Sequence, residues 1–519
     1  MSSFQVRGAP IRSRVSPAAL GTSLLAVAAL LPLVAVLLRG APAVPQVLAG
    51  DLDVVWTTIW LVLVGTLLST TIGGGLALLS WLVRLPRWAD ALLAGGYLVP
   101  PFIGATAWLA ALGPGNVLTG QPLFPVYSAG GVLLAWTTHY APLAYLLLRA
   151  TLSTQGDLPT LAARIHGLSL PRALWRVTLP LAARGIGAAV TLVALSLLGN
   201  YGVPAVLGFP AKLYTLATLA YARLLNPSLG DPLAAASGVA WLLVVLAIPA
   251  LWRRADDAGD AAGTAVPLPV PWALRGLAWT AVWLWTGLAV ALPLLALMVL
   301  AFRPAYTQGF TLANFQALFA LDSARRGLVN SVGLALGTAL SCALLGLGLA
   351  RAGQGSRLAG LALRLLNLPY LLPGTLLALG LILTLGRTPL YATPLFLMLA
   401  YLLRFTAPGL ENAQAALTSG VAQLEFAAQV HGVPRWRRFW RVTLPLLRPQ
   451  LVASFLVVYP LVLSEVTLSA LLYAPGSETA GVNVLNLLSE GNLRGAAAMA
   501  VILLVLGLPT LLVPRGQRA

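Results

Sequence analysis

The chain has 519 residues, of which 59% are hydrophobic and 9% are charged, and its formal net charge is +18. Because soluble domains carry about 25% charged residues, this composition excludes an ordinary soluble core and indicates a membrane protein. The basic residues, all arginines except Lys212, lie between apolar segments and form no basic face, so we expect no nucleic-acid partner.

In chain order, apolar segments predict about twelve membrane-spanning helices, since about 20 apolar residues cross the hydrocarbon layer as a helix. The predicted spans lie near residues 18–38, 54–83, 89–112, 129–149, 181–205, 232–252, 276–301, 327–350, 359–385, 393–410, 449–473 and 495–514. The first is longer than the apolar core of a signal peptide, about 7–15 residues, so we expect it to remain uncleaved.

The distribution of basic residues predicts the orientation. In this topology about three quarters of the 32 basic residues, Arg404 included, fall on one side, which the positive-inside rule makes cytoplasmic together with both termini. Residues 253–275, which hold Asp256, Asp257 and Asp260 besides several prolines, predict a cytoplasmic linker. The linker would separate a first half, residues 1–252, from a second half, residues 276–519.

The two halves contain a repeated segment. Thr160–Leu181 and Glu425–Leu446 match at a constant offset of 265, with 12 of 22 positions identical. Tyr97-Leu98-Val99-Pro100 also resembles Tyr370-Leu371-Leu372-Pro373. Because six spans separate equivalent points, both halves begin on the same side. They are therefore predicted to be parallel repeats, with a transport pathway at their interface.

Each repeated loop, residues 157–180 and residues 422–445, predicts a helix, a glycine turn and a second helix. Gly167 and Gly432 would adopt positive φ and end the first helix. Small residues allow close approach to a partner, and arginines anchor interfaces, so we expect these loops to dock on another protein. The alternative is a helix lying on the membrane surface, with its arginines on lipid phosphates.

The loops carry a family resemblance. Glu425, Ala427, Ala428, Gly432 and Leu444-Pro445 resemble the Glu-Ala-Ala coupling loop of binding-protein-dependent ABC importer permeases, with one additional residue after the acid. The first copy has Ala162, Ala163, Gly167 and Leu179-Pro180, but Thr160 replaces the acid. The residues that the resemblance assigns to coupling are Ala162, Ala163, Gly167, Arg172, Arg176, Glu425, Ala427, Ala428, Gly432, Arg437 and Arg441.

This resemblance implies an all-α membrane fold of two parallel six-helix repeats, the type I importer permease fold. It also implies a bacterial inner-membrane location in contact with lipid, two separate ABC ATPase subunits that bind the ATP, and a soluble substrate-binding protein. Lys212, the chain's single lysine, does not stand in a phosphate-loop pattern. We therefore expect a transport subunit without catalytic residues or a cofactor of its own.

The solute is predicted from further resemblances. The fused arrangement resembles iron(III), thiamine and aminoethylphosphonate importers, and residues 198–208 and 464–478 resemble iron-type permeases. We expect iron(III), with thiamine, aminoethylphosphonate or a polyamine as alternatives. A secondary transporter driven by an ion gradient is a further alternative, but it needs titratable groups within the spans, where the sequence offers chiefly Glu465.

Asn200 and Glu465 are equivalent positions inside predicted spans. Since polar side chains are costly in lipid, they either line the pathway or form hydrogen bonds between helices, and the sequence leaves both readings open. His166 and His431 also repeat, but their neighbours supply no metal-ligand set. We expect them to pack or hydrogen-bond within the loops, and we expect no metal site.

Overall fold

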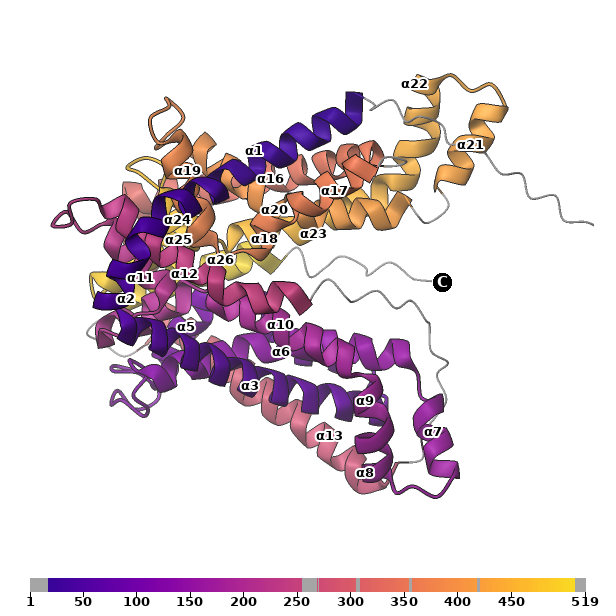
Figure 1. Cartoon of the computed structure of the whole chain (residues 1–519). Coiled ribbons are helices and arrows are strands. Elements are labelled where there is room, and N and C mark those ends of the chain that lie inside the picture. Colours follow the sequence, from indigo (N-terminus) through magenta and orange to yellow (C-terminus); the bar gives the residue numbers. More distant parts are fainter. Residues whose placement is uncertain are drawn as a thin grey trace, which may run out of the picture.

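The computed structural model describes residues 17–253, 268, 270–304, 309–353, 357–417 and 421–508. Regular structure in these ranges is entirely helical (Figure 1), which confirms the predicted fold class. The helices of the first half are α1 (Pro17–Gly40), α2 (Val44–Gly50), α3 (Leu52–Val83), α4 (Arg87–Gly95), α5 (Pro101–Leu112), α6 (Ala129–Gln155), α7 (Leu158–Ile165), α8 (Leu170–Ala173), α9 (Leu179–Leu181), α10 (Ala183–Leu198), α11 (Leu216–Leu224) and α12 (Pro232–Arg253). Those of the second half are α13 (Trp272–Leu284), α14 (Leu292–Phe302), α15 (Ala313–Ala320), α16 (Asp322–Ala352), α17 (Arg357–Leu366), α18 (Leu368–Leu371), α19 (Gly374–Leu385), α20 (Pro394–Ala416), α21 (Ala422–Val430), α22 (Arg435–Arg438), α23 (Leu444–Leu463), α24 (Thr467–Leu472), α25 (Ala480–Ser489) and α26 (Leu493–Gly507).

Many of these helices are long enough to cross a membrane. Within the described ranges, seven helices qualify by length and composition, and up to ten spans result if each of three sharply bent helix pairs counts as one. The other two predicted spans fall on α20, which carries Arg404 and Glu411, and on α26, which has 15 residues. The total of twelve spans stays a prediction.

Proline produces two of the bends. The helices on either side of Val99-Pro100 meet at 93°, and those on either side of Leu372-Pro373 meet at 106°. A residue before proline is driven out of the helical region, and Val99 and Leu372 are indeed extended, with ψ of 122° and 155°. The repeated Tyr-Leu-x-Pro motif thus marks an equivalent elbow in each half.

The packing of the helices relates the two halves. In the first half α3 packs on α6 and α10, and in the second half α16 packs on α20 and α23. The first span of each half crosses to the other half, because α1 packs on α17 and α19, whereas α14 packs on α5. The halves are therefore interlocked by an exchange of equivalent helices.

Glycines allow the closest of these crossings. A Cβ atom at Gly380 of α19 would collide with the carbonyl oxygen of Pro32 in α1, at the exchanged contact. A Cβ atom at Gly346 of α16 would collide with the backbone of Gly409 in α20. Cys342 is fully buried at this second crossing, where its backbone meets Gly409. Small residues are typical of membrane helix interfaces, because they bring backbones into contact.

The predicted division of the chain remains a prediction. α12 ends at Arg253 and α13 begins at Trp272, a few residues before the predicted start of the second half. Most of the predicted linker, residues 253–275, lies outside the described residues.

The exchanged contact can be tested at Gly380. We expect Gly380→Ala to destabilise the purified chain by about 1–3 kcal/mol, since the added methyl group must displace the backbone of α1. Gly104→Ala, whose added Cβ would have no neighbour within 4 Å, is the control and should be neutral. Thermal unfolding in detergent measures both, and equal melting temperatures for the two variants would contradict the exchange.

Candidate functional site: the coupling loops and the centre of the bundle

The two coupling loops, residues 157–180 and 422–445, protrude from the same end of the bundle at separate corners (Figure 1). The first contains α7 and α8, and the second contains α21 and α22. The opposite end carries α5, α11, α24 and α25 (Figure 1). The common end of the two loops agrees with parallel repeats, whereas their cytoplasmic orientation stays a prediction.

The glycine turns have the predicted geometry. Gly167 and Gly432 have φ of +87° and +72°. The amide of Leu168 donates to the carbonyl of Ala163 over 3.1 Å, and the amide of Val433 donates to that of Ala428 over 3.0 Å. These bonds close the same Schellman turn in both loops. A Cβ atom at either glycine would meet nothing within 4 Å, so the backbone conformation alone favours glycine.

Most of the predicted coupling residues are exposed on these protrusions. The exposed ones are Ala162, Gly167, Arg172, Arg176, Ala427, Gly432, Arg437 and Arg441, and Ala163, Glu425 and Ala428 are half-buried. Several large apolar side chains of the loops, outside the set of predicted coupling residues, are equally exposed. Ile165 and Trp175 are 75% and 74% exposed, and Val430 and Trp436 are 68% and 71% exposed. Exposed apolar groups at this density mark an interaction surface.

His166 and His431 are exposed in equivalent places next to the turns. No group of three histidine, cysteine or acidic residues within the described ranges could hold a metal ion. The predicted role of the two histidines within the loops stays a prediction.

An acid ties the second loop to a long helix. Arg351, near the end of α16, donates from Nη2 to Glu425 Oε1 over 2.5 Å, and Thr443 Oγ1 donates to the same oxygen. In the first loop the equivalent residues Thr160 and Thr178 join their hydroxyls over 2.7 Å. Replacement of the acid by Thr160 therefore keeps the internal bond of the loop but removes the charge at that position.

The first loop obtains its ion pair from a residue that the prediction missed. Arg84, at the end of α3, places Nη2 2.6 Å from Asp157 Oδ2. Asp157 immediately precedes α7 and is buried. Both loops are thus tied by an acid to an arginine at the end of a long span. An acid three residues ahead of Thr160 was the available signal, but the spacing differs from that of the family pattern.

Comparisons with known proteins agree with this arrangement. The family model of the binding-protein-dependent transport system inner membrane component matches residues 342–515, which include the second coupling loop. A probable molybdenum ABC transporter permease protein of Haloferax volcanii is 33% identical over 234 residues, which are 43% of this chain and 82% of that protein. The chain belongs to the ABC transporter permeases.

Other relatives of this permease match longer or shorter stretches. A probable ABC transporter permease protein of Sinorhizobium fredii is 25% identical over 456 residues, 80% of this chain and 79% of that protein. A putative 2-aminoethylphosphonate transport system permease protein of Salmonella paratyphi A is 28% identical over 143 residues, 27% of this chain. The permease spans about half the length, 54%, of this aminoethylphosphonate relative.

The structure brings the two predicted pathway residues to the junction of the halves. A Cβ atom at Gly199, next to Asn200, would lie 3.2 Å from Pro373 Cα in the second half. A Cβ atom at Gly202 would lie 3.1 Å from Val466 Cγ1, next to Glu465. Asn200 and Glu465 therefore flank the contact between the halves near the centre of the bundle.

Asn200 also forms the hydrogen bonds between helices of the alternative reading, whereas Glu465 forms a local backbone cap. Asn200 accepts from Trp136 Nε1 over 3.1 Å, donates to the Tyr140 hydroxyl over 2.9 Å and accepts from the Val203 amide. Glu465 Oε1 accepts from the amide of Leu468 over 2.8 Å, which is the equivalent backbone cap. Asn200 and Glu465 thus lie at the junction between the halves and also form hydrogen bonds. Their role in transport stays a prediction.

Glu465 has a charged partner that corrects the predicted topology. Arg404 Nε lies 3.6 Å from Glu465 Oε2, and the two side chains are 17% and 10% exposed. Its position in the middle of α20 contradicts the assignment of Arg404 to a cytoplasmic segment. The predicted span of residues 393–410 contained Arg404. Because the chain has many arginines that flank its spans, Arg404 was interpreted as one of them.

A cavity of about 160 Å³ lies beside this junction, towards the end opposite the coupling loops. Tyr127, Tyr201 and Tyr221 contribute its wall from the first half, and Tyr473, Asn486 and Ser489 contribute its wall from the second half. Tyr201 follows Asn200 directly, so one wall of the cavity lies next to the junction between the two halves.

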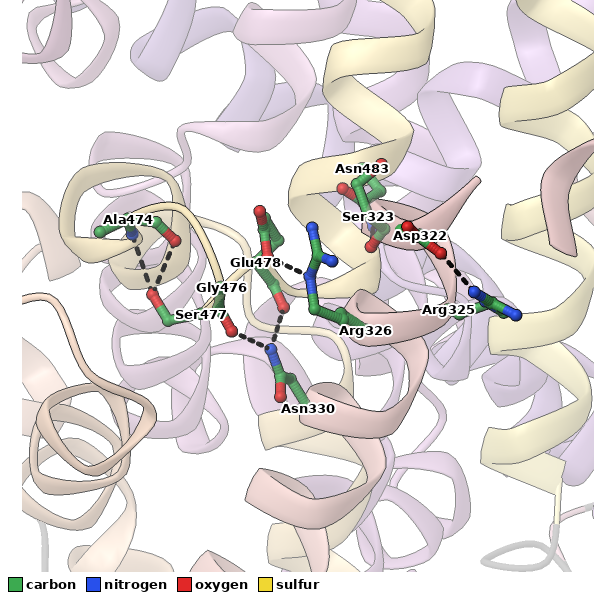
Figure 2. Close-up of polar contacts among 10 residues, drawn as sticks. All are labelled: Asp322, Ser323, Arg325, Arg326, Asn330, Ala474, Gly476, Ser477, Glu478 and Asn483. Carbon is green, nitrogen blue, oxygen red and sulfur yellow. Dashed lines mark hydrogen bonds and ion pairs between the residues drawn. The ribbon is translucent and has the colours of Figure 1, made fainter. Parts of the chain in front are cut away.

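Figure 2 shows the polar contacts of the segment that follows Tyr473, a residue of the cavity wall. Arg326 Nε of α16 lies 3.7 Å from Glu478 Oε2, and Asn330 Nδ2 donates to the carbonyls of Gly476 and Glu478 over 3.1 and 2.9 Å. Asn483 donates to the carbonyl of Ser323 over 2.8 Å. These bonds attach the segment that follows Tyr473 to the start of α16.

The glycine turn of the second loop can be tested by substitution. We expect Gly432→Val to reduce solute uptake at least tenfold while the protein stays in the membrane, because a β-branched residue at positive φ is strained by about 1–2 kcal/mol. Gly432→Asn is the matched control, since asparagine tolerates this conformation and open space surrounds the position. Equal uptake by the valine and asparagine variants would show that the turn does not matter.

Proposed function

We propose that this permease is the membrane-spanning subunit of an ABC importer, with both halves of the pathway in one chain. Two separate ATPase subunits would dock on the coupling loops, and a soluble binding protein would deliver solute at the opposite end. The observation that carries the proposal is the pair of loops with the same Schellman turn, which protrude from one end of the bundle.

The surface of the loops favours a protein partner over lipid. Each protrusion combines exposed aromatic and aliphatic side chains with several arginines and a small-residue face at Ala162 or Ala427. Tryptophan and arginine are enriched in protein interface anchors, and small residues permit close docking. The two short helices of each loop pack against each other across the glycine turn, a shape that fits a socket better than a flat bilayer surface.

The proposed roles of the coupling residues follow from their positions. Gly167 and Gly432 shape the turns, and Arg172, Arg176, Arg437 and Arg441 would contact the ATPase subunits. Glu425, together with Asp157 in the first half, would transmit movement of the docked subunits to α16 and α3 through the ion pairs with Arg351 and Arg84.

The solute is the least constrained part of the proposal. The relatives described above are named for 2-aminoethylphosphonate and molybdenum, and none of them is named for iron. Among the solutes predicted from the sequence, aminoethylphosphonate is therefore the one that the comparisons support. Iron(III), thiamine and a polyamine stay predictions without such support.

The proposal is tested by reconstitution with ATPase subunits and the binding protein. We expect Trp175→Ala with Trp440→Ala to weaken binding of the ATPase subunits at least tenfold, because a buried interface tryptophan contributes about 2 kcal/mol or more. Trp56→Ala is the control, since Trp56 is 67% exposed near the start of α3, a 32-residue helix whose other end, at Arg84, pairs with the first loop. Co-purification and ATP-dependent uptake into vesicles are the measurements. Uptake driven by an ion gradient without ATPase subunits would favour the secondary transporter instead.

A further inference from the structure

The strongest unexplained feature is the guanidinium of Arg404 at the junction of the halves. It covers the elbow between α18 and α19, where a Cβ atom at Gly374 would lie 3.0 Å from Arg404 Nη1. Nη1 donates to the carbonyl of Leu372 over 3.3 Å. The next residue, Pro373, contacts Gly199 of the first half. The charge therefore lies next to the surface at which the two halves separate or close.

The hydrogen bonding of Arg404 is incomplete. A guanidinium has five N–H donors. Nε is buried and has no hydrogen-bond partner among the described residues, since Glu465 Oε2 at 3.6 Å is beyond hydrogen-bond distance. The carboxylate cannot move freely towards it, because Glu465 Oε1 caps the amide of Leu468. Glu465 thus holds Arg404 electrostatically but leaves part of its donor set available.

The first half offers no second charge of this kind. His139 is the equivalent of Arg404 at the offset of 265, and it bonds to the backbone of Val99 as Arg404 bonds to Leu372. Asn200 is the equivalent of Glu465, and its amide is occupied by Trp136, Tyr140 and Val203. The central charge pair is therefore particular to the second half, although equivalent backbone positions exist in both.

We propose that Arg404 is the anion-binding residue of the translocation pathway and that the solute is a small oxyanion, such as a phosphonate or a metal oxyanion. The inference rests on the proposed function and names the solute class of the same pathway. A guanidinium fork matches the oxygens of such anions in a bidentate manner. Ionisable residues inside spans mark substrate pathways, and arginines line pores for anions and phosphate.

The cavity outside the junction agrees with this solute class. Its volume of about 160 Å³ accommodates a solute of a few heavy atoms, and the polar side chains that line it, among them Tyr127, Tyr473 and Asn486, are neutral. The residues that line it include no carboxylate. A cationic solute would be repelled by the guanidinium at the junction, whereas an oxyanion would be attracted by it.

Charge-removing variants of the central pair test the proposal. We would reconstitute the permease with its ATPase subunits and binding protein, and measure uptake of molybdate, 2-aminoethylphosphonate and iron(III) loaded on the binding protein. The double variant Arg404→Gln with Glu465→Gln removes both charges, and so avoids leaving one of them buried without its partner. We expect it to lose oxyanion uptake at least tenfold, whereas Arg404→Lys retains part of the uptake and Glu465→Gln retains most of it.

Controls separate this inference from the proposed function. The double variant should still co-purify with the ATPase subunits, and Arg39→Gln, an exposed arginine at 55%, should transport normally. Oxyanion uptake by the double variant at the level of the wild type would overturn the proposal. It would also be overturned if the wild type transported iron(III) and neither oxyanion, and if Glu465→Gln abolished that iron(III) uptake. Wild-type protein that moves no probe on addition of ATP would instead contradict the importer function itself.

Discussion

Close backbone contact at glycine is the constraint on which the rest of this permease depends. Apolar side chains gain no free energy when they move from lipid into a helix interface, because lipid tails are equally apolar. Helices in a membrane therefore associate through close packing and polar contacts. Gly346 brings α16 onto α20, and Gly380 brings α19 onto the exchanged helix α1. Gly199 and Gly202 then bring the halves together at the centre. The bundle is thus assembled from narrow crossings, and Asn200 and Arg404 each lie within a few residues of one of them.

The sequence predicted the features that repeat. The coupling turns were predictable because positive φ requires glycine at a fixed distance from a helix end, and the duplication displayed this distance twice. The bends at Pro100 and Pro373 were implicit in the repeated Tyr-Leu-x-Pro motif. By contrast, the exchange of α1 and α14 between halves was not predictable, since it depends on contacts far apart in the chain. Arg404 was misplaced because many arginines of this chain flank its predicted spans, and Arg404 lies only a few residues before the predicted end of its own span.

The differences between the halves are as informative as their likeness. The tie between a coupling loop and a long span is present twice, but the acid is Glu425 in one half and Asp157 in the other. The first half keeps a neutral hydroxyl pair, Thr160 with Thr178, where the second half joins Thr443 to Glu425. An ion pair between the loop and a long helix is therefore retained in both halves, although the acid stands at a different position in each loop. The central charge is not retained in this way, because His139 and Asn200 occupy the places of Arg404 and Glu465. The tie of a loop to a long span is thus present in both halves, whereas the central charge pair occurs at these positions of the second half alone.

These observations connect the protrusions to the centre of the bundle by a short physical route. Arg351 links Glu425 of the second loop to the end of α16, and α16 packs along α20, the helix that carries Arg404. At the crossing of these helices Gly346 and Gly409 touch through their backbones, so sliding there is limited by hard contact and not by flexible side chains. The first half has the same route from Asp157 through Arg84 to α3 and then to α6, the helix of His139 and Tyr140. A force applied at the two loops would therefore move the two walls of the central junction as rigid units. Because Arg404 touches the elbow that meets Gly199, such a movement would change the surroundings of its free donors at the moment when the halves separate.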